Sequence, residues 1–212
     1  MDEKAVEIKE LVNSILGDGE NSPDIKYGEL PAIDLYMDQL TTFLEERLRP
    51  MLRDTEAEKF LTKTMINNYA KNDLIPPPVK KKYTREHLIF LILIFYNKSF
   101  LSMDDIKKLL EPLRTGCGEG SSFNTPGELY SFLLEVIDKE RPSIKKQISE
   151  YEEKAKSDIP AGDDAEKMRR FLLLSMLSYD VYVKKLMIER LLDMDSESGS
   201  RKLHTDRRKK DI

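Results

Sequence analysis

The chain has 212 residues, which is enough for one compact hydrophobic core or two small ones. Hydrophobic residues make up 40% and charged residues 35%, so we expect a soluble globular protein with abundant solvated surface. The formal net charge of −4 argues against a protein that coats nucleic acid with its whole surface.

Single features exclude further classes of protein. One cysteine, Cys117, excludes an intramolecular disulfide framework and a cysteine-rich zinc site. The first ten residues show no basic stretch followed by an apolar stretch, so we expect no secretion signal. The longest apolar run, at 88–96, is about half as long as a membrane-spanning helix requires. We therefore expect a cytoplasmic protein with no membrane contact, metal or cofactor.

Before the prolines at 76–78, the sequence predicts three helices, at 1–16, 33–48 and 55–72. Apolar residues three and four apart indicate the first two. Thr55 with Glu58 three residues later forms a capping-box pattern that opens the third. The three prolines cannot donate backbone hydrogen bonds, so this helix ends before them.

After the prolines, the sequence predicts five more helices, at 84–98, 102–113, 126–139, 143–157 and 163–194. Thr84 and Ser102 can cap the first two, and Thr125, Pro126 and Glu128 occupy three favoured positions of a helix start. No stretch of any length alternates as a strand does. The predicted fold class is therefore all-α, apart from a tiny wing hairpin.

Positive charge is concentrated in one part of the chain. Residues 59–88 contain seven cations against Asp73 and Glu86, a net charge of +5 that leaves −9 for the rest of the chain. An acidic body with one basic face approaches DNA in one orientation, because phosphate repels the remainder.

Residues 62–72 have the two faces that a helix in a DNA major groove needs. Apolar anchors lie three or four apart at Leu61, Met65, Ile66 and Tyr69. The other side carries small polar and basic residues, which are Lys63, Thr64, Asn67, Asn68 and Lys71. Asparagine can pair with adenine, while lysine and threonine can contact phosphate or base edges. The alternative for the two asparagines is an ordinary surface role.

A short basic segment follows the prolines, in the position of a wing. Lys80, Lys81 and Lys82 are candidates for phosphate contact, together with Arg85. Tyr83 can either pack or bond phosphate. The alternative reading of the lysines is a solvated loop.

The same residues resemble a known family. NNYAKNDLIPPP at 67–78 and YTREHLIFLILIFYNKSFLSMDDIKKLL at 83–110 are similar to two consecutive blocks of MerR-type transcription regulators. IDLYMDQLTTFLEERL at 33–48 and LTKTMINNYAKNDLIPPPVKKKY at 61–83 resemble signature blocks of a bacterial family, domain of unknown function 1836, which is itself MerR-like. The resemblance covers about residues 30–113 and implies a winged helix-turn-helix.

The resemblance also implies roles for particular residues. Thr64, Asn67, Asn68 and Lys71 would occupy recognition-helix positions, and Lys81 the place of a wing arginine that contacts phosphate. Asn67 and Asn68 replace an arginine and a tyrosine of the MerR block. Val79 replaces the wing glycine.

Five segments follow from these observations. They are 1–29, an N-terminal helix and loop; 30–114, a winged helix-turn-helix DNA-binding domain; 115–125, a linker; 126–194, a helical C-terminal region; and 195–212, a disordered tail. The helix at 163–194 is apolar around most of its circumference, so it must be covered on more than one side. We expect helices 126–157 on one side and a second subunit on another, since MerR-like proteins dimerise through C-terminal helices. Full burial within a monomer is the alternative.

The predicted function is that of a cytoplasmic bacterial transcription regulator, with double-stranded DNA and a second copy of the chain as partners. The alternative is a winged helix that binds proteins, with the basic wing docking an acidic partner. An apolar effector pocket among the C-terminal helices is a third interpretation, although core packing explains the same residues. We do not expect an enzyme, because the carboxylate pairs at 104–105 and 163–164 lie at helix starts, where capping explains them.

Overall fold

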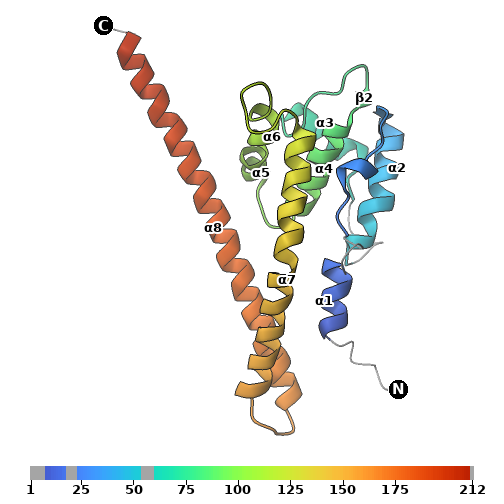
Figure 1. The fold of residues 1–212 in the computed structure, drawn as a ribbon, viewed down its shortest axis with the longest axis vertical. Coiled ribbons are helices and arrows are strands. Elements are labelled where there is room, and N and C mark those ends of the chain that lie inside the picture. The colour runs from blue at the N-terminus through green and yellow to red at the C-terminus, as the bar shows by residue number, and fades with distance from the viewer. Residues whose placement is uncertain (1–7, 18–22, 54–59, 211–212) are drawn as a thin grey trace.

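The computed structural model describes residues 8–17, 23–53 and 60–210, and the side chains as far as residue 194. The helices are α1 (Ile8–Leu16), α2 (Met37–Leu48), α3 (Lys63–Lys71), α4 (Arg85–Asn97), α5 (Met103–Leu109), α6 (Glu111–Thr115), α7 (Pro126–Asp158) and α8 (Ala165–Lys210). Two short 3-10 helices lie at Tyr27–Glu29 and Arg49–Met51. Strands β1 (Leu35–Tyr36) and β2 (Lys82–Tyr83) form a two-stranded sheet (Figure 1). Helices account for 70% of the described residues, which confirms the all-α class.

Helix α4 forms the centre of the core. Its sequence is apolar almost throughout, and eight of its thirteen residues are buried. Helix α2 packs against it with Leu40, Leu44 and Leu48, which are four residues apart and fully buried. Each such side chain contributes roughly 1.5–3 kcal/mol relative to an exposed one. The apolar sequence of α4 therefore provides the base on which the preceding helices are held.

The short sheet brings together segments that are distant in sequence. Leu35 pairs with Tyr83 and Tyr36 with Lys82, in antiparallel register. The predicted helix start at Ile33 is wrong, because residues 35–36 are extended and α2 begins at Met37. Leu35 is buried and Tyr36 is exposed, so the segment alternates as a strand does. A short run of apolar residues fits the repeat of a helix as well as that of a strand. The pairing with β2 makes this segment a strand.

Helix α3 is shorter than predicted. It begins at Lys63, where Oγ1 of the preceding Thr62 accepts a hydrogen bond from the backbone N–H of Met65 at 3.2 Å. The predicted start at Thr55 and Glu58 lies outside the described residues. At the other end, Asp73 adopts a positive φ of 55° and the N–H of Leu74 donates to the carbonyl oxygen of Tyr69 at 2.8 Å. This is a Schellman ending, and the prolines follow it as predicted.

The predicted helix at 102–113 is two helices. Ser102 caps α5 as expected, since its Oγ accepts from the N–H of Asp105 at 3.1 Å. The chain then breaks at Leu110 and α6 begins at Glu111. Pro112 explains the break, because it has no N–H to continue the hydrogen bonding of α5.

Two predicted helices, at 126–139 and 143–157, are instead the single helix α7 of 33 residues. Thr125 caps it as predicted, with Oγ1 accepting from the N–H of Glu128 at 3.2 Å. Pro142 lies inside the helix, where it removes one backbone hydrogen bond. Contacts of the neighbouring Arg141 with Asp24 hold this part of α7 against the N-terminal segment.

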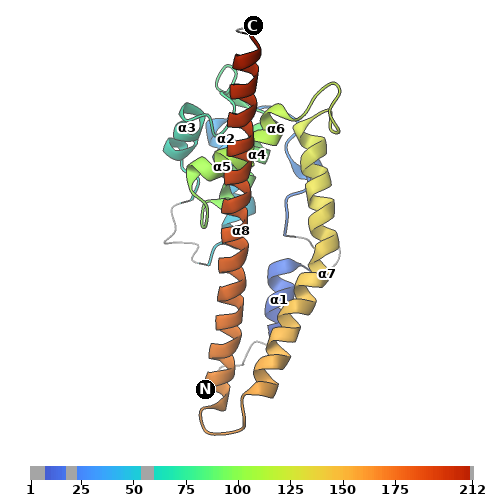
Figure 2. The ribbon, with the colours of Figure 1, turned by 90° about the vertical axis from the view of Figure 1, so that its left-hand side faces the viewer.

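Helix α8 has 46 residues and runs back along α7. The two helices pack at their lower ends, where Ala155 and Leu173 are buried, and they separate above (Figures 1 and 2). Residues 195–210 continue α8, where the sequence predicted a disordered tail. The lysine, arginine and glutamate residues of this segment favour a helical backbone.

The first half of α7 belongs to the same core as α4. Tyr130 is fully buried, and its hydroxyl donates to the carbonyl oxygen of Ile25 at 2.7 Å. Leu134, one turn later, is also buried. The segment 115–125, predicted as a linker, therefore joins elements that share one core. Among the described helices, none has the length and apolar character that crossing a membrane requires.

Candidate nucleic-acid interface

The two faces of α3 are arranged as the sequence predicted. Ile66 and Tyr69 are buried in the core and anchor the helix. The polar and basic side chains at Lys63, Thr64, Asn67, Asn68 and Lys71 are all exposed. The helix therefore presents amide, hydroxyl and ammonium groups on one surface while its apolar residues fix its position.

The segment Val79–Lys82, which we call the lysine turn, reverses the chain between the prolines and β2. The N–H of Lys82 donates to the carbonyl oxygen of Val79 at 3.0 Å. Lys80 and Lys81 both have positive φ, of 51° and 63°. This is the geometry of a type I′ turn, which strongly favours Asn-Gly. Two lysines in this conformation store strain at the tip of the turn, and such strain often marks a functional segment.

The lysine turn and α3 lie near each other at one end of the molecule. Figure 1 shows the loop from α3 to β2 at the same upper end as α3 itself. Within the described part of the chain, no hydrogen bond or ion pair occupies the side chains of Lys71, Lys80 and Lys81. These three ammonium groups are therefore available to a ligand.

Tyr83 does not belong to this exposed surface. It is only 3% exposed, and its ring meets that of His87 edge-on with 5.4 Å between centroids. Of the two roles considered for Tyr83, packing and phosphate bonding, the structure supports packing, because a buried ring cannot contact DNA. The reason is the strand register, because Tyr83 faces inward opposite Leu35 while Lys82 faces outward.

His87 holds the residues that follow the lysine turn, at the junction of β2 and α4. It is buried, and its Nδ1 accepts a hydrogen bond from the backbone N–H of Thr84 at 3.0 Å. Nδ1 must therefore be unprotonated. Burial lowers the pKa of His87, because desolvation disfavours the imidazolium form.

Three other predicted cations are engaged within the chain. Lys63 forms an ion pair with Asp38 at the start of α2. Lys82 lies over the ring of Tyr36, with Nζ 5.4 Å from its centroid. Arg85 donates from Nε to the carbonyl oxygen of Pro31 at 3.0 Å, and its guanidinium lies over the ring of Tyr27. These contacts position α2, β1 and α4 relative to one another, a role that sequence spacing alone does not reveal.

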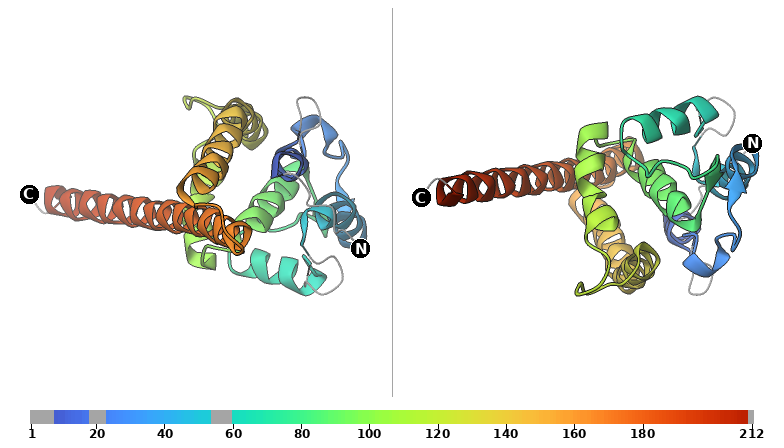
Figure 3. Two further views of the ribbon diagram at one scale, coloured as in Figure 1. Left: turned by 90° about the horizontal axis from the view of Figure 1, so that it is seen from below. Right: turned by 90° about the horizontal axis from the view of Figure 1, so that it is seen from above.

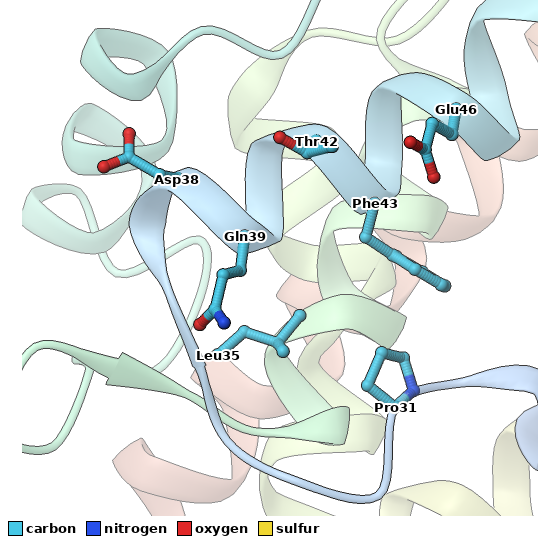
Figure 4. Close-up of a pocket in the computed structure, with 7 residues that line it drawn as sticks. All are labelled: Pro31, Leu35, Asp38, Gln39, Thr42, Phe43 and Glu46. Carbon is cyan, nitrogen blue, oxygen red and sulfur yellow. The ribbon is translucent and has the colours of Figure 1, made fainter.

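A shallow groove of about 440 Å³ lies beside α2, and Asp38, the partner of Lys63, is one of its lining residues. Figure 4 shows Pro31, Leu35 and Phe43 converging on its floor, with Asp38 projecting away from them. Its polar lining is acidic or neutral, so it does not extend the basic surface. Among the described residues, no group of three or more histidine, cysteine, aspartate and glutamate side chains could hold a metal ion.

Residues 25–133 match the family model described as Domain of unknown function (DUF1836). The chain belongs to this family. The DUF1836 match extends from the segment before β1 to the first turns of α7, so it includes α3, the lysine turn and His87. Helix α8 lies beyond it. No curated protein and no solved structure matches the chain.

Proposed function

We propose that this DUF1836 protein is a sequence-specific DNA-binding transcription regulator of bacteria. Helix α3 would enter the major groove, and the lysine turn would hold phosphates beside it. The observation that carries the proposal is the uncovered polar face of α3 next to a strained turn whose two tip residues are lysines. A surface built only for solubility would not require Lys80 and Lys81 in left-handed backbone geometry.

The order of elements supports a winged helix-turn-helix of the MerR type. Helices α2 and α3 are the helix pair, the lysine turn with β2 is the wing, and β1 secures the wing by pairing with β2. In this arrangement Asn67 and Asn68 face bases, since an asparagine amide can form two hydrogen bonds with adenine. Lys71, Lys80 and Lys81 neutralise phosphates, and the acidic remainder of the chain turns away from the duplex.

A second copy of the chain is the proposed partner of α8. In the described part of this helix eleven large apolar side chains are exposed, at Met168, Phe171, Leu174, Tyr179, Val181, Tyr182, Val183, Leu186, Met187, Leu191 and Met194. Helix α7 covers only one side, so the alternative of full burial within a monomer does not hold for these residues. Phe171, Ser175, Tyr179, Tyr182 and Leu186 are three or four residues apart, a spacing that forms a continuous ridge for a second helix. Two-fold pairing would present two copies of α3 to two half-sites.

Selection from a random duplex library tests the proposal directly. Purified protein should enrich a defined sequence, and affinity for that sequence should fall steeply with salt. The variant Lys80→Ala/Lys81→Ala/Lys82→Ala should bind more weakly, with a salt slope smaller by about 1.8 because Lys80 and Lys81 are the two phosphate contacts it removes. The control Lys139→Ala/Lys146→Ala/Lys154→Ala removes the same charge from exposed positions of α7 and should bind as the wild type does.

Two results would contradict DNA binding. One is the absence of any enriched sequence at low salt, and the other is an equal effect of the two triple variants. If the lysine turn instead captures an acidic protein, and this capture survives nuclease treatment, the alternative of a protein-binding module is favoured.

A further inference from the structure

Helix α5 lies between α3 and α8, and Figures 1 and 3 show this from two directions. Two consecutive lysines of α5 contact these different neighbours. The Nζ of Lys107 donates to the backbone carbonyl oxygen of Asn72 at 3.1 Å and lies 3.7 Å from Oδ2 of Asp73, at the end of α3. The Nζ of Lys108 lies 3.8 Å from Oδ1 of Asp193 on α8. Adjacent side chains thus connect α3 to α8 through one short helix.

Lys107 contacts the residues that end α3, where the backbone is strained. Asp73 has a φ of 55°, a conformation that usually falls to glycine at the end of a helix. Backbone carbonyls at this end carry partial negative charge, which the ammonium group of Lys107 complements. Any displacement of α5 would remove a cation from a helix end that is already held in an unfavourable conformation.

Apolar packing also fixes the position of this part of α8. Leu192 is buried, and Ile188, one turn earlier, packs against the main core. Ile106 of α5 is a fully buried member of the same core. Asp193 is therefore positioned by the packing of α8, so that its distance from Lys108 follows the position of the whole helix.

We propose that α5 couples α8 to α3, with the position of α8 against Lys108 setting the stability of the last turn of α3 through Lys107. Lys107 is then a positioning residue for the DNA-binding face. The consequence for DNA binding rests on the proposed function, whereas the link between the two helices does not. Movement of α8 away from α5 loosens the end of α3 and weakens binding.

Hydrogen exchange of the full-length protein tests the link without DNA. Asp193→Lys places a cation opposite Lys108, and exchange at the amides of residues 72–74 should become about two- to five-fold faster, the range that one exposed ion pair supplies. The double variant Asp193→Lys/Lys108→Asp should restore the wild-type rate. Asp180→Lys is the control, because Asp180 pairs within α8 with Lys184 at 2.7 Å and should leave residues 72–74 unchanged.

The coupling is refuted by an unchanged rate at residues 72–74 in Asp193→Lys, by an equal change in Asp180→Lys, or by a uniform rise that includes α4. The last result would mean general destabilisation. These outcomes do not depend on whether the protein binds DNA.

The salt dependence of DNA binding tests the role of Lys107. Lys107→Gln should weaken affinity about two- to five-fold with an unchanged salt slope, and Lys107→Arg should restore it. Lys71→Gln should instead reduce the slope by about 0.9, because it removes a phosphate contact. An equal loss of slope in Lys107→Gln would make Lys107 a phosphate ligand and overturn its positioning role. If the wild type binds no DNA, the proposed function fails, and hydrogen exchange alone decides the coupling.

Discussion

Arg141 of α7 and Asp24 form an ion pair that joins positions 117 residues apart. Their side chains are only 13% and 16% exposed. Arg141 also contacts Asp138 at 2.8 Å, and the hydroxyl of Tyr96 donates to the Asp24 carboxylate at 3.4 Å. Burial raises the pKa of Tyr96, so its phenol stays protonated and keeps this hydrogen bond. The cluster fastens the segment before β1 to α4 and α7.

Breaking this pair should be strongly destabilising. Arg141→Met leaves the Asp24 carboxylate largely buried without its guanidinium, and we expect the free energy of unfolding to fall by about 3–5 kcal/mol. Arg47→Met is the matched control, because the Arg47–Glu29 pair is about 40% exposed and should contribute less than about 1 kcal/mol. Urea titrations that gave equal losses for the two variants would contradict the structural role of Arg141.

His87 should make stability depend on pH. Its pKa is lowered in the folded protein, so the unfolded chain binds the proton more readily. The contribution of His87 is therefore complete above the unfolded pKa of about 6.5 and is lost as the pH falls through and below that value. His87→Gln should flatten the pH dependence of unfolding between about pH 5 and pH 7. An unchanged pH dependence in His87→Gln would exclude His87 as the cause.

In the lysine turn, residues that favour DNA binding should lower the stability of the fold. Lys80→Asn/Lys81→Gly introduces the residues that a type I′ turn favours, so we expect the free energy of unfolding to rise by about 1–2 kcal/mol. The same variant should bind DNA with a salt slope smaller by about 1.8. Lys80→Gln/Lys81→Gln removes the same charge and should lose affinity without gaining stability. Stabilisation by the glutamine variant would show that charge repulsion, rather than backbone strain, is relieved.

Residues of α3 should affect recognition in two distinct ways. Asn67→Ala should relax preference at one base pair by about 1–3 kcal/mol, because bidentate contacts with bases discriminate by that amount. Lys71→Gln should weaken binding to all sequences alike. Asn124→Ala, at an exposed loop position before α7, serves as the amide control. Affinities for single-base variants of the selected sequence distinguish these patterns, and an unchanged profile in Asn67→Ala would remove it from the base-contacting set.

The apolar ridge of α8 should determine the oligomeric state. Phe171→Glu/Tyr182→Glu places charges where we expect a second copy, and burial of each side chain is worth about 1.5–3 kcal/mol. Sedimentation should show a dimer for the wild type and a dissociation constant raised more than about a hundredfold for the variant. Phe132→Glu, an exposed position of α7, should remain dimeric. A monomeric wild type at micromolar concentration would contradict the proposed dimer.

Local sequence signals predicted the features that depend on neighbouring residues. Ser102 and Thr125 cap their helices as expected, because a hydroxyl and the N–H three residues later are brought together by the helix start itself. The polar face of α3 was equally predictable, since the helical repeat separates Asn67 from the buried Ile66 and Tyr69.

Features that depend on distant partners were not predictable in this way. The strand at 35–36 exists because β2 pairs with it, and the same register buries Tyr83. Pro142 does not end α7, because the surrounding helix is packed against the core and α1. Lys63 and Arg85 find partners within the chain at Asp38 and Pro31, which no spacing along the sequence indicates.

The sequence by itself determined where α4, α5 and α7 begin, which face of α3 is polar, and that one basic segment stands apart from an acidic body. Those properties follow from side-chain chemistry and backbone geometry within a few residues. Only the tertiary structure decided which cations remain uncovered, that Lys107 and Lys108 join α3 to α8, and how much of α8 is exposed. The reason is that burial and pairing depend on distances between segments far apart along the chain, and folding alone determines these distances.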